Sequence, residues 1–185
     1  MIAVFSGSFN PFHYGHLDIL KYLHSAPWIS KILVVISPKN PWKEVSIYIQ
    51  SPTERLEAVR KIILDYGLDD KCEASDIEFL RPQPIYTVDT LRQIQTLYPG
   101  EEIRLVCGAD CLDEIMQWKE GKTIIEDIGL IVFPRSGYDL DELLSKYPEA
   151  KILASTKMPR EISSTEIRRR LENKEDYSEL TPIRI

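Results

Sequence analysis

The sequence predicts an α/β fold with a doubly wound parallel sheet, and three observations carry that prediction. Short apolar runs without charge, such as residues 2–5, 32–36 and 130–133, are typical of strands buried on both faces. Stretches with apolar residues at helical spacing separate these runs, so strand and helix alternate along the chain. No internal repeat, low-complexity tract or linker interrupts the alternation. We therefore expect one domain over residues 1–185, joined by right-handed crossovers.

The first two strands are expected at residues 2–5 and 31–36, where nearly every side chain is apolar. Leucines at helical spacing predict a helix over residues 17–23, directly after the first strand. A second helix begins at Ser51, because Glu54 lies three residues later and completes a capping box.

The middle of the chain continues the pattern. Polar and apolar residues alternate over 72–79, which predicts a strand with one exposed face. Thr87 is the expected cap of the next helix, and residues 103–107 predict a central strand. A further helix is expected to run through Met116 to Trp118.

The last third contributes two strands and two helices to the prediction. Residues 124–128 lead into a strand at 129–133, which a short helix at 140–146 follows. A strand near 151–154 and a helix over 162–171 complete the chain.

The turn between the first strand and the first helix has the composition of an anion site. It contains Gly7 and Ser8, and the imidazoles of His13 and His16 lie at the start of the helix. Helix N-termini attract anions through unpaired N–H groups and partial positive charge, so a phosphate is the expected guest. The alternative is a tight connection with structural histidines. Neither a P-loop nor a G-x-G-x-x-G fingerprint is present.

A second anion site is expected at the start of the last helix. Ser163, Ser164 and Thr165 provide three hydroxyls, more than a helix cap needs, and Arg168 follows one turn after Ser164. The alternative is an ordinary cap followed by a solvated basic helix. Lys39 and Lys43, in the polar loop after the second strand, are further candidates for phosphate contact.

Charge and cysteine content exclude some classes of protein. The formal net charge of -6 argues against a non-specific nucleic-acid binder. Cys72, Cys107 and Cys111 form no C-x-x-C pair and are expected as reduced thiols in a cytoplasmic protein. The alternative is a metal site from Cys107, Cys111 and a distant histidine. No apolar segment is long enough for a membrane span.

The stretch from Gly7 to His16 ends in H-x-G-H and resembles the phosphate-binding motif of the nucleotidylyltransferase superfamily. Residues 162–168 resemble the second motif of the same superfamily, so the resemblance spans the chain and implies its Rossmann-like fold. It implies that His13, His16 and Arg168 are catalytic. It also implies ATP binding by Gly7, Ser8, Phe9, Ile162, Ser163, Ser164 and Thr165. Lys39 and Arg135, which each follow a predicted strand, are the further candidates for contact with the ATP phosphates.

Three further stretches resemble the bacterial nicotinate-nucleotide adenylyltransferases: residues 86–90, residues 108–110, and Trp118. The resemblance implies that Trp118 stacks on a pyridinium ring, for which indole is the best aromatic partner. It places Tyr86, Thr87 and Thr90 near the ring carboxylate and Gly108 in the acceptor pocket, and it implies that Asp110 holds the acceptor's ribose or the loop around it. Core packing for Trp118 and a helix cap for Asp110 are the alternatives.

The reaction implied by the resemblance is transfer of the adenylyl group of ATP to nicotinate mononucleotide, which gives deamido-NAD and pyrophosphate. Mg²⁺ would arrive with ATP and need no dedicated protein site. The alternatives are nicotinamide mononucleotide or phosphopantetheine as acceptor, or a nucleotide-binding regulator without turnover. The terminal segment 179–185 is shorter than the family pattern, which leaves open its packing and any homo-oligomer contact.

Overall fold

A computed structural model describes residues 1–38 and 50–184 of the chain. Lys39 and Lys43, the two lysines expected to contact phosphate, lie outside the described residues.

Six parallel strands form one sheet in the order β3-β2-β1-β4-β5-β6. This is the order of a doubly wound fold, with helices on both faces, and it confirms the predicted fold class. The strands are β1 Ile2–Gly7, β2 Lys31–Ile36, β3 Cys72–Ser75, β4 Ile103–Gly108, β5 Leu130–Phe133 and β6 Ile152–Ala154.

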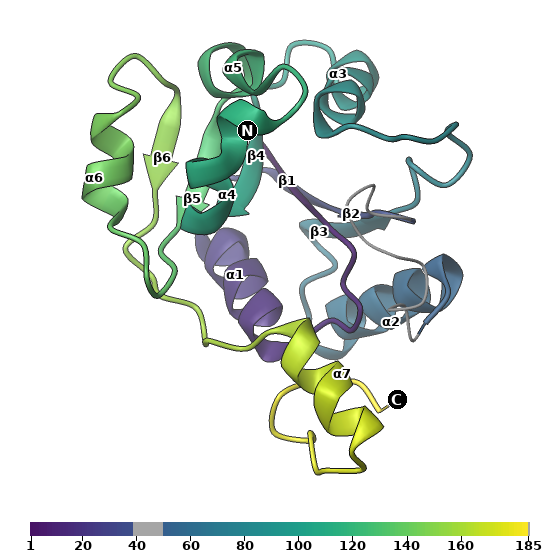
Figure 1. Ribbon diagram of the computed structural model, residues 1–185. Coiled ribbons are helices and arrows are strands. Elements are labelled where there is room, and N and C mark those ends of the chain that lie inside the picture. The colour runs from purple at the N-terminus through teal and green to yellow at the C-terminus, as the bar shows by residue number, and fades with distance from the viewer. Residues whose placement is uncertain (39–49, 185) are drawn as a thin grey trace.

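Helical segments connect the strands and follow the last one (Figure 1). They are α1 Tyr14–Ser25, α2 Pro52–Asp65, α3 Thr87–Leu97, α4 Ala109–Glu114, the 3₁₀ turn η2 Ile115–Gln117, α5 Gly121–Thr123, the π-helical segment η3 Ile124–Ile128, α6 Leu140–Ser145 and α7 Ser164–Glu172.

The core has two layers because successive strand residues point to opposite faces of the sheet. In β1, Ala3 and Phe5 pack with the apolar residues of α1 and α2. Ile2 and Val4 pack on the other face with α3, α4 and the segments that follow α4. Both faces of the central strands are therefore buried, which explains their uninterrupted apolar runs.

Three local predictions are wrong in detail. The strand expected over 72–79 ends at Ser75, since the chain then turns inward and buries Glu78. The helix expected to reach Trp118 breaks after Glu114 into η2, and residues 124–128 form a π-helical turn. Thr87 is the first residue of α3 and not its cap, because the N-cap position belongs to Tyr86.

The order of the strands reverses between β1 and β4, and ligands bind at such a switch point in open α/β sheets. The loop after β1 leads into α1, and β4 ends at Gly108 beside it. Figure 1 shows α7, in yellow, next to the start of α1, although the two come from opposite ends of the chain. In the part of the chain that the structure describes, no helix is long and apolar enough to cross a membrane.

Candidate active site

Two histidines form the capping box of α1. The main-chain N–H of His16 donates to Nδ1 of His13 at 3.3 Å, and the N–H of His13 donates to Nδ1 of His16 at 3.2 Å. A capping box normally uses Ser or Thr with Glu or Gln, so imidazoles take over both side-chain roles here. A neutral imidazole whose Nδ1 accepts a hydrogen bond carries its proton on Nε2. The box therefore leaves both Nε2–H groups as donors.

The two rings are stacked, with centroids 3.5 Å apart and planes 19° from parallel. Burial, followed by the charge of Arg135, lowers the pKa of His13 from 6.5 to about 3. The pKa of His16 also lies well below 6.5, through burial and then through His13 and Arg135. Phe5, Phe9 and Phe12 surround the His16 ring, with centroids 5.0 to 5.9 Å from it. The pair is thus neutral near pH 7.

The segment before α7 packs directly on the start of α1. The guanidinium of Arg160 binds both carboxylate oxygens of Asp18, each at 2.8 Å, and lies over the ring of Tyr14. A Cβ at position 15 would stand 2.6 Å from the main-chain oxygen of Arg160, so only glycine fits there. Gly15 of the H-x-G-H motif thus marks a close approach of two backbones.

Helix α7 then binds the loop that precedes the histidines. The Ser164 hydroxyl donates to the main-chain oxygen of Pro11 at 2.9 Å, and Nη1 of Arg168 donates to that of Asn10 at 2.7 Å. Nη2 of Arg168 donates to the Thr165 hydroxyl at 2.9 Å, and the Ser163 hydroxyl accepts the N–H of Glu166 as the cap of α7. The two predicted anion sites therefore meet at one loop.

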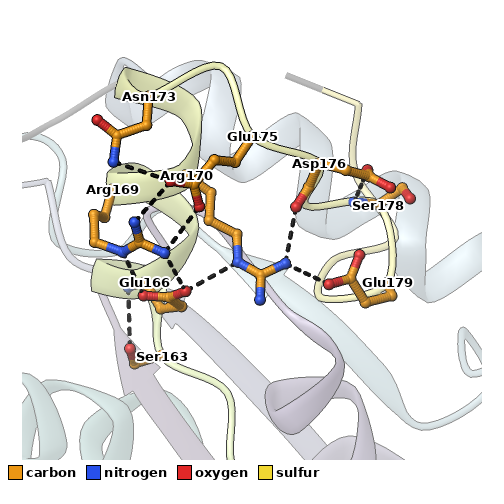
Figure 2. Close-up of polar contacts among 9 residues, drawn as sticks. All are labelled: Ser163, Glu166, Arg169, Arg170, Asn173, Glu175, Asp176, Ser178 and Glu179. Atoms are coloured by element: carbon orange, nitrogen blue, oxygen red, sulfur yellow. Dashed lines mark hydrogen bonds and ion pairs between the residues drawn. The ribbon is translucent and has the colours of Figure 1, made fainter.

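Ion pairs join α7 to the turn that follows the helix (Figure 2). Arg169 and Arg170 both bind Glu166. In the turn that follows, Arg169 also binds Glu175 and Arg170 also binds Glu179. Figure 2 shows the two guanidinium groups joining the helix to this turn.

The chain end reaches the H-x-G-H loop by this path. The Thr181 hydroxyl donates to the main-chain oxygen of Phe12 at 2.6 Å, and the N–H of Tyr14 donates to the main-chain oxygen of Leu180 at 3.1 Å. Thr181 is buried. The terminal segment thus packs against the loop, a contact that sequence reasoning missed because nothing in the residues 181–184 indicates their partner.

Arg135 lies beside the end of β4, close enough to the two histidines for its charge to act on them. Its Nε lies 3.8 Å from Oδ2 of Asp110, and a Cβ added at Gly108 would lie 3.8 Å from its Cδ. Its charge contributes to the lowered pKa values of both histidines. Asp110 lies in the first turn of α4, whose N-cap is Gly108, so the alternative of Asp110 as the cap is wrong.

A cleft of about 380 Å³ opens beside this group. Pro134, Met158 and Pro159 give it apolar walls, and Arg135, Ser163 and Arg170 bring polar groups to it. Ile162, at the entrance to α7, lines it too, and its N–H donates to the main-chain oxygen of Arg160. A concave site with apolar walls and a few placed polar groups suits a small organic ligand.

Gly7, Ser8 and Phe9 form the start of the loop after β1. A Cβ at Gly7 would lie 3.2 Å from the ring of Phe9, which itself has φ of 45° and is buried. Arg55 of α2, 1% exposed, donates to the main-chain oxygens of Ser8 and, at 2.8 Å, of Ser37. This buried guanidinium joins the ends of β1 and β2, and sequence reasoning had assigned it no role.

The residues expected at the acceptor ring surround the start of α3. Thr90 is 1% exposed, and its hydroxyl donates to Glu78 and accepts from Arg81, each at 2.7 Å. The other carboxylate oxygen of Glu78 accepts the Ser37 hydroxyl at 2.9 Å. Thr90 therefore fixes two charged neighbours, and its hydroxyl is engaged inside the protein. Sequence reasoning missed Glu78 and Arg81.

Trp118 caps the C-terminal end of η2, and its main-chain N–H donates to the main-chain oxygen of Ile115 at 3.0 Å. It is partly buried against the α3–α4 side of the core. Tyr86 and Thr87 stand at the start of α3 on the same side of the sheet, and Tyr86 packs against the same cluster. Part of the Trp118 side chain therefore packs against the core, as the core-packing alternative expected.

Among residues 1–38 and 50–184, no three His, Cys, Asp or Glu side chains are grouped so that they could hold a metal ion. The imidazoles, hydroxyls and guanidinium groups beside the H-x-G-H loop are donors to phosphate oxygens. The Asp18 carboxylate also lies near His13, and both of its oxygens are bound by Arg160.

Comparison with known proteins places the chain in a family. The sequence pattern of the cytidylyltransferase-like family matches residues 4–170. The chain is 33% identical over 185 residues to a protein of Flavobacterium psychrophilum named probable nicotinate-nucleotide adenylyltransferase, with 100% of this chain and 93% of that protein covered. A Thermus thermophilus protein of the same name is 34% identical over 92% of this chain and 86% of its own length. The chain belongs to the nicotinate-nucleotide adenylyltransferase family.

Solved structures agree with this family at the level of the fold. The nicotinic acid mononucleotide adenylyltransferase of Plasmodium falciparum complexed with NaAD superposes with a TM-score of 0.79 at 24% identity, covering 95% of this chain and 85% of that one. The same enzyme complexed with APC gives a TM-score of 0.81 at 22% identity, over 98% of this chain and 90% of that one. The expected Rossmann-like nucleotidylyltransferase fold is thereby confirmed.

Proposed function

We propose that this member of the nicotinate-nucleotide adenylyltransferase family transfers the adenylyl group of ATP to nicotinate mononucleotide, giving deamido-NAD and pyrophosphate. The observation that carries the proposal is the hydrogen bond from Ser164 to Pro11, which brings the α7 N-terminus to the loop of His13 and His16. Two helix N-termini and two imidazole donors can then act on one triphosphate.

Binding of the triphosphate follows from the donors at this junction. The Nε2–H groups of His13 and His16 donate to phosphate oxygens near the reacting phosphorus, and the start of α7 with Arg168 takes the β and γ phosphates. Arg135, close enough to the imidazoles to lower their pKa values, supplies positive charge on the other side. At Gly7, Ser8 and Phe9 the backbone of the loop after β1 can approach the triphosphate closely.

The nucleophile in this reaction is the 5′-phosphate of the mononucleotide, which is already an anion. Attack on the α-phosphorus of ATP therefore needs no general base, and catalysis consists of alignment and charge neutralisation. Neutral imidazoles suit that task, because they donate hydrogen bonds without having to lose a proton. The low pKa of His13, about 3, supports this role.

The acceptor lies, in this proposal, between the start of α3 and the turn that carries Trp118. The Trp118 indole stacks on the cationic pyridinium, and N–H groups at Tyr86 and Thr87 face the ring carboxylate. Asp110, which pairs with Arg135, is assigned to the acceptor ribose. Thr90 contributes by holding Glu78 and Arg81 in place.

A divalent cation enters this scheme as part of the ATP substrate. We assign Mg²⁺ to the phosphate oxygens and water, in line with the donor set beside the H-x-G-H loop. The cation neutralises phosphate charge when bound, and the protein contributes the hydrogen-bond donors around it.

An assay for pyrophosphate release tests the proposal. The protein is incubated with Mg·ATP and one acceptor at a time: nicotinate mononucleotide, nicotinamide mononucleotide or phosphopantetheine. We expect the fastest release with nicotinate mononucleotide, together with deamido-NAD identified by mass spectrometry. Release with phosphopantetheine alone would replace the proposed acceptor, and ATP binding without release from any acceptor would favour the regulator.

A further inference from the structure

The turn that carries Trp118 is fastened to α3 by two ion pairs. Nζ of Lys119 donates to Oδ2 of Asp89 at 2.9 Å. The guanidinium of Arg92 binds both carboxylate oxygens of Glu120, at 3.0 and 2.6 Å. The charges run in opposite order on the two segments, negative then positive on α3 and positive then negative on the turn. Only one register of the turn on the helix satisfies both pairs.

The first pair also contacts an aromatic residue at the start of α3. Nζ of Lys119 lies 4.7 Å from the centre of the Tyr86 ring, a cation–π distance. Lys119 follows Trp118 directly in the chain. The ammonium group therefore ties together the two aromatic residues that the proposed function assigns to the acceptor.

The backbone of the turn leaves little freedom for alternative positions. Glu120 has φ of 52°, in the left-handed region that non-glycine residues seldom adopt. A Cβ at Gly121 would lie 1.8 Å from the main-chain oxygen of Ile115, so the turn is folded tightly onto η2. The N–H of Gly121 donates to the main-chain oxygen of Trp118 at 3.1 Å. Displacement of Glu120 would therefore displace Trp118.

Ordinary surface stabilisation does not account well for this arrangement. The four side chains are 29% to 49% exposed, and exposed ion pairs contribute little to stability. Pairs such as Arg60 with Glu57 lie within one helix, where neighbouring turns bring them together. The two pairs on α3 instead join segments 28 and 30 residues apart. These pairs therefore fix the position of the Trp118 turn on α3, although they add little to the free energy of unfolding.

We propose that Asp89, Arg92, Lys119 and Glu120 are positioning residues that hold the Trp118 indole at the Tyr86 end of α3 and so set the affinity for the pyridine mononucleotide. The inference rests on the proposed function, because it takes Trp118 as the surface on which the pyridinium ring stacks. The ATP side of the site, at α7 and the H-x-G-H loop, does not depend on these pairs.

Steady-state kinetics of charge-neutral variants test the inference. In Arg92→Gln and Glu120→Gln we expect the KM for nicotinate mononucleotide to rise about two- to fivefold, the range that loss of an exposed pair allows. The kcat and the KM for ATP should stay within about twofold of the wild type. Combining Arg92→Glu with Glu120→Arg re-forms the pair with reversed charges and should restore most of the lost affinity.

A matched control is Arg60→Gln, which breaks an exposed ion pair on α2 and should change no kinetic constant. Unchanged acceptor KM in both α3-side variants, with wild-type turnover intact, would overturn the inference and leave the proposed function standing. Equal losses in all constants, with a lowered thermal midpoint and no rescue by the charge swap, would also overturn it.

Calorimetric binding of nicotinate mononucleotide to the wild type separates failure of the inference from failure of the function. If the wild type neither binds this acceptor nor releases pyrophosphate with it, the proposed function fails and the inference fails with it. If the wild type binds this acceptor and releases pyrophosphate with it, and the variants bind it several-fold more weakly, both stand.

Discussion

The main-chain oxygen of Arg160 occupies the space that a side chain at Gly15 would need, 2.6 Å from the position of its Cβ. Arg160 also binds Asp18, one turn into α1. The glycine of H-x-G-H thus lets the chain before α7 lie against the helix that the histidines cap. The distance between the two phosphate motifs depends on this contact.

Gly15→Ala should therefore separate the two motifs. We expect a loss of about 1–3 kcal/mol in the free energy of unfolding from the overlap, and a fall in kcat of roughly a hundredfold from misalignment. Urea denaturation and pyrophosphate release measure the two effects. Gly67→Ala is the control, because Gly67 has φ of 60° with nothing within 4 Å of an added Cβ. It should lose about 1 kcal/mol of stability and keep its kcat; equal activity in both variants would contradict the prediction.

His16→Ala should remove a phosphate donor and one half of the capping box. We expect kcat to fall roughly a hundred- to a thousandfold, with about 1 kcal/mol of stability lost from the missing cap. His24 is the third histidine of the chain and pairs with Asp70 at the surface. His24→Ala should keep the wild-type kcat. Near-normal turnover in His16→Ala would remove the assigned role.

The buried histidines should make the fold sensitive to mild acid. The native pKa of His13 lies at about 3, below the ordinary value of 6.5, and that of His16 is also lowered. As the pH falls below about 6.5, the unfolded chain binds protons that the native state does not. Stability is therefore lost as the pH falls, by about 1.4 kcal/mol per pH unit for each imidazole.

Urea midpoints at about pH 7 and about pH 5.5 test this linkage, with the wild type compared to a His13→Asn, His16→Asn double variant. The wild type should lose roughly 2 kcal/mol more than the double variant between the two conditions. Parallel losses in the two proteins would show that other groups control the acid response. The kcat should not follow a histidine titration across this range.

Arg55→Met should loosen the loop that begins the phosphate site. The buried guanidinium donates to the main-chain oxygens of Ser8, Ser37 and Pro38, and methionine would leave these acceptors without it. We expect a loss of about 2–4 kcal/mol in the free energy of unfolding. Arg60→Met, on the exposed side of the same helix, is the control and should change stability by about 0.5 kcal/mol or less. Equal effects in both variants would contradict the assigned role of Arg55.

Local patterns were sufficient for the fold class and for most of the elements. The apolar runs of β1 and β2, and the capping box of Ser51 and Glu54, depend on residues near in sequence, and the structure contains them as predicted. The role of His13 and His16 as reciprocal caps could also have been found from their spacing of three. Their stacking depends on a ring geometry that no sequence pattern encodes.

Contacts between distant segments could not be predicted in the same way. Arg55 resembles any exposed helical arginine until its partners on two loops are known. Thr181 and Glu78 are also ordinary polar residues in sequence, yet each is buried against a segment far along the chain. Thr87 was misplaced as a cap because β-hydroxyl residues favour that position on average, whereas here Tyr86 occupies it.

The central claim is that both ends of the chain bind one triphosphate, and a crystal structure with α,β-methylene-ATP tests it most directly, because this analogue cannot donate its adenylyl group. The account predicts phosphate oxygens within hydrogen-bonding distance of Nε2 of His13 or His16 and also of the α7 N-terminus at residues 163–165. A triphosphate bound to one of these groups alone, with the other facing solvent, would contradict it.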